Sequence, residues 1–214
     1  MATLLDMLVV LLVLANFRLL GSSRLLACIR TVAAQAVLLG ATAVCANWAH
    51  LEGELVLIVC SSVAIKAVLL PWLLRRAARE AAVTREVEPL IGFSLSLLAG
   101  AGLLAVCLLI AAPLRVPGAP SSGLMIPASL FTILTGLFLI VARKKAVTQV
   151  LGYLCMENGI HAFGMAFAVR EPLLVGMAVL LDVLAAVLVM GIAIYHISRE
   201  FDHIDTDRLT ALKE

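Results

Sequence analysis

The sequence predicts an all-α fold, a polytopic membrane helix bundle with seven transmembrane helices. Three observations support this prediction. Of the 214 residues, 63% are hydrophobic and only 14% are charged, whereas a soluble domain is about half apolar and about a quarter charged. The mean hydropathy is +1.12. The apolar residues also fall into separate stretches, which leave no room for an additional soluble domain.

Each apolar stretch is long enough to cross about 30 Å of hydrocarbon as an α-helix, which satisfies its own backbone hydrogen bonds. In order, the predicted helices are 2–20, 26–48, 54–74, 90–112, 124–142, 146–169 and 173–197. Most prolines mark helix boundaries or connections: Pro89, Pro113, Pro117, Pro120, Pro127 and Pro172. Pro71 falls in the last turn of the third helix, where a kink is tolerated.

The helices are grouped into three parts. Residues 1–142 hold five N-terminal membrane helices, and the fifth of these, 124–142, also opens a three-helix part in residues 124–197. Residues 198–214 form a tail. The first helix is not expected to be a secretory signal, because no basic residue precedes it and Asp6 opens its apolar region.

The basic residues lie on one side of the predicted membrane. The cytoplasmic set is Arg18, Arg24, Arg30, Arg75, Arg76, Arg79, Arg85, Arg143, Lys144, Lys145, Arg199, Arg208 and Lys213. The opposite connections hold only Arg115 and Arg170. Because positive charges remain on the cytoplasmic side, this pattern predicts an N-terminus outside and a cytoplasmic C-terminus.

Several classes of function are excluded by the residue patterns. The five cysteines show no metal-ligand spacing, so neither structural zinc nor an iron–sulfur cluster is expected in this chain. No glycine-rich phosphate loop, nucleophile elbow or HExxH motif is present. The basic residues flank the membrane helices, so nucleic acid is not an expected partner. The chain therefore has no predicted catalytic site of its own.

Three ionisable residues lie deep inside predicted membrane helices. Glu157 is near the middle of the sixth helix, Asp182 lies at similar depth in the seventh, and Lys66 lies in the third. A charged side chain at this depth is costly unless it is paired, hydrated or protonated, so each is a candidate functional residue. Two acids and a base inside one bundle predict a proton relay.

Further polar residues extend this predicted relay. Four residues of the sixth helix recur every four positions and therefore share a face: Gln149, Tyr153, Glu157 and His161. His196 lies near the face of Asp182, closer to the cytoplasmic end. We interpret His161 as part of the relay, and Gln149, Tyr153 and His196 as supporting polar residues.

Structural roles are alternatives for the same residues. Glu157 can pair permanently with Lys66, or with a charge on another subunit, and lock the packing of the helices. Asp182 can hydrogen-bond to a neighbouring helix, and Lys66 can close a salt bridge without moving protons. His161 can serve as an accessory hydrogen-bonding residue.

Motifs spread from the third predicted helix to the C-terminus together carry a family resemblance. They are Ile65-Lys66 running into Val68-Leu69-Leu70-Pro71, Arg143-Lys144-Lys145, Gly152-Tyr153, Met156-Glu157-Asn158-Gly159 with His161, Asp182 followed by Val189-Met190, and Leu209-Thr210-Ala211-Leu212-Lys213. These motifs resemble the membrane component E of hydrogenase 4.

The last three predicted helices are also similar to the small K subunit of respiratory complex I. In that subunit a basic cytoplasmic loop precedes a mid-membrane glutamate, and the next helix carries a second acid. Here the loop is Arg143-Lys144-Lys145 and the first acid is Glu157. The second acid falls on Asp182, which is one methylene shorter than the glutamate of complex I.

The resemblance implies an integral subunit of a complex I-like, group 4 [NiFe]-hydrogenase of the formate hydrogenlyase type in a bacterial inner membrane. The implied partners are antiporter-like membrane subunits, a membrane anchor subunit similar to the H subunit of complex I, and the hydrogenase module. The nickel–iron site and iron–sulfur clusters would belong to those partners.

Three alternatives to this function remain. One is a structural subunit without its own proton path, and another is a subunit of a related cation/proton antiporter-like complex. The third is a stand-alone secondary transporter, which is not favoured because the chain shows neither an internal repeat nor a helix interrupted near mid-membrane.

Overall fold

The computed structural model describes residues 2–46, 48, 53–80, 90–114, 123–167 and 191. Within this part the chain is built of helices. In chain order these are α1 (Ala2–Gly21), α2 (Leu25–Ala46), α3 (Gly53–Ala64), the π-helical segment η2 (Ile65–Leu69), α4 (Leu70–Glu80), α5 (Phe93–Ala111), α6 (Met125–Ala142) and α7 (Ala146–Phe167). The prediction of an all-α protein is confirmed for the described residues.

The number of membrane helices is established only in part. Four helices of the described chain are long and apolar enough to cross a membrane: Thr3–Gly21, Leu25–Ala46, Phe93–Ala111 and Met125–Ala142. The third predicted span is occupied by α3, η2 and α4, which follow one another without a gap. The sixth predicted span is occupied by α7. Its polar residues lower its mean hydropathy, so α7 is not among these four helices. The seventh predicted span, 173–197, lies outside the described residues.

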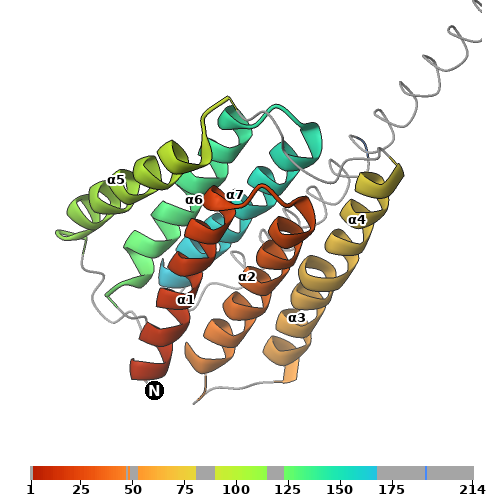
Figure 1. The fold of residues 1–214 in the computed structure, drawn as a ribbon. Helices are drawn as coiled ribbons and strands as arrows, with labels where there is room; N and C mark the ends of the chain where they lie inside the picture. Colours follow the sequence, from red (N-terminus) through yellow and green to blue (C-terminus); the bar gives the residue numbers. More distant parts are fainter. Residues whose placement is uncertain are drawn as a thin grey trace, which may run out of the picture.

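The helices lie side by side in a bundle (Figure 1). α1, α2 and the continuous α3–η2–α4 rod form one side, and α6 and α7 lie behind them. α5 is inclined across α6 and also contacts α1. α6 and α7 make the most extensive pairing, and α2 bridges α7 and the α3–η2–α4 rod. Apolar side chains of α1, α2, α4, α6 and α7 fill the centre of the bundle.

The wide turn η2 has a clear cause in Pro71. Proline has no N–H and its ring clashes with the carbonyl four residues earlier, which is that of Ala67. The chain opens into a π-helical turn over Ile65–Leu69, closed by the N–H of Leu70 donating to the carbonyl of Ile65. π-Helical turns of this kind occur often at functional sites. Here the turn carries Lys66.

The rod extends past the predicted end of the third span, residue 74. α4 continues to Glu80 through Arg75, Arg76 and Arg79. Arginine and alanine are strong helix formers, so the helix does not end where the apolar stretch ends. Hydropathy marks the segment that suits a membrane, and it does not mark the end of the helix.

Buried Arg143 joins three segments at the end of α6. Its side chain is enclosed, and Nη2 donates to the carbonyl of Leu20 at the end of α1 at 2.8 Å. Nη1 donates to the carbonyl of Ile91 at 3.4 Å, and the guanidinium lies over the Phe93 ring, 4.5 Å from its centroid. Arg143 therefore donates to the Leu20 carbonyl, one of the last carbonyls of α1 that have no partner within the helix, and links it to the segment just before α5.

Glycines bring α6 and α7 into backbone contact. A Cβ placed on Gly152 would lie 2.8 Å from the Gly136 carbonyl oxygen and 2.9 Å from the Ile140 nitrogen. A Cβ on Gly159 would lie 2.6 Å from the Ile133 nitrogen. Small residues at such crossings are typical of membrane helices, which associate through close packing. The contact fixes the rotation of α7, and hence the direction of Glu157.

We expect Gly159→Ala to destabilise the bundle by about 1–3 kcal/mol, the usual effect of overpacking a tight contact. The added methyl meets backbone atoms of α6, which cannot move without separating the two helices. Gly164→Ala is the matched control on the same helix, because a Cβ there meets nothing within 4 Å. Thermal unfolding in detergent measures both variants. Equal midpoints for the two would contradict the packing described here.

Candidate functional site

The site is centred on an ion pair between η2 and α7. Lys66 Nζ lies 3.2 Å from Glu157 Oε1, and the two side chains are only 7% and 2% exposed. The π-helical turn presents Lys66, and the glycine contact between α6 and α7 presents Glu157. Two residues far apart in the sequence, each predicted to be functional because of its depth, are therefore in direct contact.

The pair lies in a small cavity that is packed too closely to hold a water molecule. Its lining residues come from α2, η2, α4 and α7: Val32, Lys66, Leu70, Leu154, Glu157 and Asn158. The apolar members keep the local dielectric low, so the attraction between the two charges is stronger than at a surface. The same surroundings penalise either charge when it stands alone. Each charge is therefore stabilised by the other, and removing one leaves its partner buried alone.

A second buried polar cluster lies between α1, α2, α6 and α7. Asn16 Nδ2 donates to Thr132 Oγ1 at 2.7 Å, and Gln35 Nε2 donates to Asn16 Oδ1 at 2.7 Å. The Cys155 thiol donates to Asn16 Oδ1 at 3.5 Å. All four side chains are completely buried. The sequence analysis missed this cluster; its only signal was the presence of Asn16 and Gln35 within apolar stretches.

The polar cluster borders the ion-pair cavity. Gln35 lies one helical turn along α2 from Val32, and Cys155 lies one turn along α7 from Asn158. Gln35 Oε1 and Asn158 Nδ2 are buried without a hydrogen-bond partner among the described residues. Buried polar atoms in this condition are rare in proteins and require an explanation. These two atoms lie near the Lys66–Glu157 pair, and each can still form a hydrogen bond.

The four predicted residues of the polar column all lie on α7 as expected. Glu157 is buried, whereas Gln149, Tyr153 and His161 are half-buried. Gln149 Nε2 donates to the backbone carbonyl of Arg143 at 3.0 Å, so this amide holds the connection between α6 and α7. The structure therefore gives Gln149 a structural partner. The interpretation of His161 as part of the relay, and of Tyr153 as a supporting polar residue, stays a prediction.

Two other predicted site residues fall outside the described part of the chain. Asp182 and His196 belong to the seventh predicted span, of which the structure describes only residue 191. Their relation to Glu157 stays a prediction.

Comparison with known proteins identifies the family. Hydrogenase-4 component E of Escherichia coli is 30% identical over 160 residues, which cover 75% of this chain and 74% of that protein. The chain belongs to the hydrogenase-4 component E family. Hydrogenase-4 component E of Shigella flexneri matches over the same length at the same identity. An uncharacterized protein of Mycobacterium tuberculosis is 34% identical over 206 residues, covering 95% of this chain and 93% of the relative.

A second comparison concerns the C-terminal part of this family member. Residues 124–214 match the family model described as NADH-ubiquinone/plastoquinone oxidoreductase chain 4L. No solved structure matches the chain. Glu157 lies inside the chain 4L-like part and Lys66 lies before it. The buried ion pair therefore links the chain 4L-like helices to a helix that precedes them.

Proposed function

We propose that this protein is a membrane subunit of a complex I-like, group 4 [NiFe]-hydrogenase of the formate hydrogenlyase type. In this proposal it contributes buried charged residues to proton translocation coupled to hydrogen chemistry. Family membership supports the hydrogenase assignment, and the chain 4L-like part supports the relation to complex I. Four long apolar helices support the membrane location.

The observation that carries the proton-transfer role is the contact between Lys66 and Glu157. The pair is buried, 3.2 Å apart, and enclosed largely by apolar side chains. In the proposed relay, a proton that reaches Glu157 removes the negative charge that faces Lys66, and Lys66 then passes a proton onward. A coupled acid–base pair of this kind moves charge laterally through the membrane interior without any redox group.

The remaining predicted residues extend this proposal in two directions. Asp182 is the second acid of the relay, with His196 as its polar neighbour. His161 continues the face of Glu157 along α7, with Tyr153 and Gln149 on the side of the α6–α7 connection. The proposed route runs laterally between the antiporter-like subunits and the anchor subunit that carries the hydrogenase module. The nickel–iron site and the iron–sulfur clusters belong to those partners.

A structural subunit is the second candidate, and the same ion pair favours it. A buried Lys–Glu contact between two helices also fixes their register, whether or not a proton moves. The two roles differ in what happens when both charges are removed together. A register lock is replaceable by two neutral side chains of similar size, whereas a relay is not.

We expect the chain, carrying an affinity tag after Glu214, to co-purify with a [NiFe]-hydrogenase large subunit and with antiporter-like membrane subunits. Mild detergent extracts analysed by mass spectrometry measure this, and another tagged inner-membrane protein from the same cells is the control. Recovery with antiporter-like subunits but without any hydrogenase subunit would instead favour a cation/proton antiporter-like complex. Recovery of the chain alone would reject the proposed assembly.

A further inference from the structure

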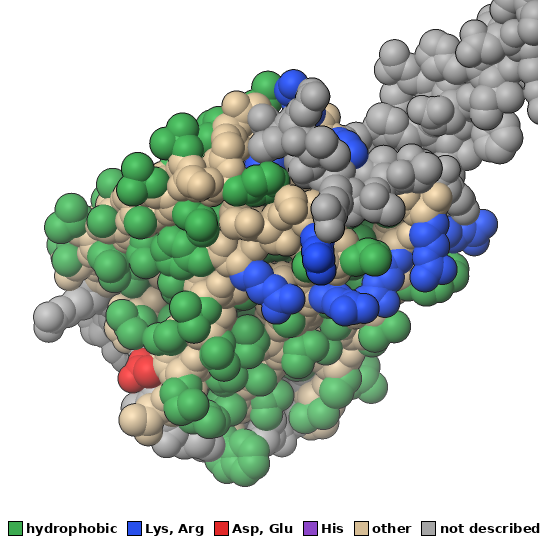
Figure 2. Space-filling view, in the orientation of Figure 1, with side chains coloured by type: hydrophobic (Ala, Val, Ile, Leu, Met, Phe, Trp, Pro, Cys, Tyr) green, Lys and Arg blue, Asp and Glu red, His purple; other side chains and the backbone are tan. Residues whose placement is uncertain are grey.

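Asn158 on α7 is a buried polar residue outside the set assigned to the relay. Its side chain is 2% exposed, and its Nδ2 is buried without a hydrogen-bond partner among the described residues. The bundle surface is mostly apolar on the face that Figure 2 shows, as suits contact with lipid. A buried amide in such a bundle must find its partners in the interior, and an N–H left without one is costly.

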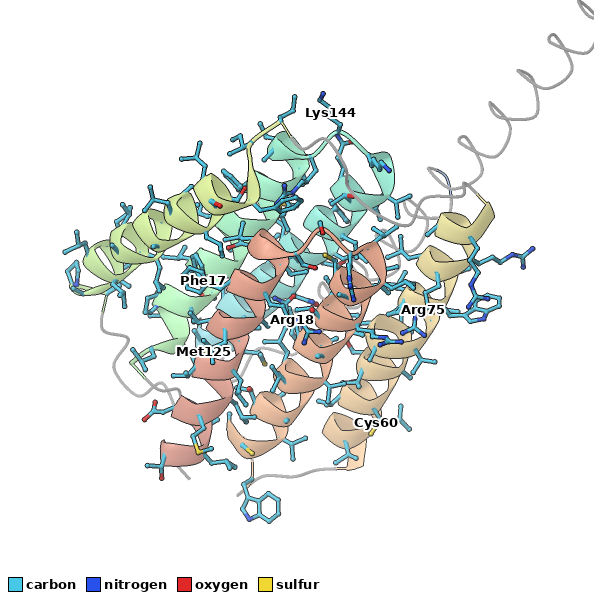
Figure 3. All side chains as sticks on the ribbon, viewed as in Figure 1. Phe17, Arg18, Cys60, Arg75, Met125 and Lys144 are labelled. Carbon is cyan, nitrogen blue, oxygen red and sulfur yellow. The ribbon has the colours of Figure 1, made fainter. Side chains whose placement is uncertain are left out.

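The position of Asn158 places it beside the ion pair. Leu154, Glu157 and Asn158 follow the i, i+3, i+4 spacing and share one face of α7, and all three line the cavity that holds Lys66. Side chains fill the space between the surrounding helices (Figure 3). The cavity is packed too closely to hold a water molecule. Apart from Asn158, the polar side chains that line it are Lys66 and Glu157.

The chemistry of the amide selects Glu157 as its partner. An amide N–H donates a hydrogen bond, and the protonated Lys66 ammonium is itself a donor. The Glu157 carboxylate accepts through either oxygen, and the protonated acid still accepts through its carbonyl oxygen. Asn158 can therefore hold the Glu157 side chain in both of its protonation states. Lys66 holds it strongly only while both groups are charged.

Two other neutral side-chain atoms of the described residues are buried without a hydrogen-bond partner. They are Gln35 Oε1 on α2 and Thr135 Oγ1 on α6. Neither residue lines the cavity of the ion pair. Asn158 is thus distinguished by its place beside Glu157, and Thr135 supplies a matched control residue.

We infer that Asn158 is a positioning residue, which donates from Nδ2 to the Glu157 carboxyl group while Lys66 is neutral. The inference rests on the proposed function, since only a relay requires Lys66 to lose its charge. In a relay the ion pair must part and form again, and a buried carboxyl group that has lost its partner is left unsatisfied. Asn158 supplies the replacement contact and keeps Glu157 directed toward Lys66. A register lock has no need of this contact, because its two charges never separate.

Infrared difference spectroscopy tests the contact itself, in the assembled complex that carries Lys66→Met as a stand-in for neutral lysine. The carbonyl stretch of protonated Glu157 is assigned by its loss in Glu157→Gln. A carbonyl that accepts a hydrogen bond absorbs at lower frequency. We therefore expect Asn158→Leu, which keeps the branched shape without the donor, to move this band to higher frequency. Thr135→Val is the matched control and should leave the band in place. An unchanged band in Asn158→Leu would overturn the inference, because the amide would then serve another group.

Proton translocation by sealed vesicles tests the consequence without the Lys66 substitution. We expect Asn158→Leu to assemble normally and to reduce translocation per assembled complex about fivefold, the factor that corresponds to one lost neutral hydrogen bond. Thr135→Val should leave translocation unchanged. Reduced assembly of Asn158→Leu with full translocation per complex would show a packing role and overturn the inference.

The inference and the proposed function can fail separately. Loss of translocation in Glu157→Gln together with normal translocation in Asn158→Leu would reject only the positioning role of Asn158. Normal translocation in Glu157→Gln would reject the proposed relay, and the positioning role would be rejected with it.

Discussion

Glu157→Gln should reduce proton translocation by the assembled complex about a hundredfold or more, the lower range expected for removal of a proton-transferring side chain. Glutamine keeps the volume of glutamate and can still accept a hydrogen bond from Lys66, but it cannot exchange a proton. Because no redox ligand is predicted in this chain, dye-mediated hydrogenase activity should survive. The loss should therefore appear in coupling and not in catalysis.

Proton uptake or release by sealed vesicles containing the complex measures this effect. Asp6→Asn is the matched control, since it neutralises one carboxylate on α1 far from the ion pair. Moving the acid by one turn, as Glu157→Gln with His161→Glu, should restore part of the translocation because the carboxylate stays on the same face of α7. Wild-type translocation by Glu157→Gln would mean that the residue is structural, and the relay would be rejected.

The sequence was sufficient to find the residues of the ion pair, but not to prove their contact. Depth alone selected Lys66 and Glu157, because a charge at mid-membrane is costly and requires a reason. Their pairing was one of several alternatives. It depends on the rotation of two helices, which is set by the glycine contact of α6 with α7 and by the π-helical turn before Pro71. Neither rotation follows from hydropathy.

The second polar cluster shows a different limit of sequence analysis. Asn16, Gln35, Thr132 and Cys155 stand singly in four apolar stretches, and each is compatible with an isolated hydrogen bond to its own helix. Their meeting requires the positions of α1, α2, α6 and α7 relative to one another. Arg143 was similarly assigned to a basic loop, whereas its side chain is buried against backbone carbonyls. In both cases, the contacts of these side chains depend on how the helices pack against one another.

Lys66→Met should lower the amount of assembled complex, because it leaves Glu157 buried without its cation. Stranding one member of a buried pair costs about 3–5 kcal/mol, whereas replacing both members with neutral groups is often tolerated. We therefore expect Lys66→Met with Glu157→Gln to assemble better than Lys66→Met alone. This comparison separates the contribution of the pair to stability from its contribution to proton movement.

The decisive measurement is proton translocation by the double variant, normalised to the amount of assembled complex. If the pair is a relay, Lys66→Met with Glu157→Gln restores assembly while translocation stays near background. If the pair only fixes the register of η2 and α7, the same double variant restores both, and the structural role is established. Normal assembly together with normal translocation in Lys66→Met alone would remove both roles, because neither a relay nor a lock survives the loss of the cation that lies 3.2 Å from Glu157.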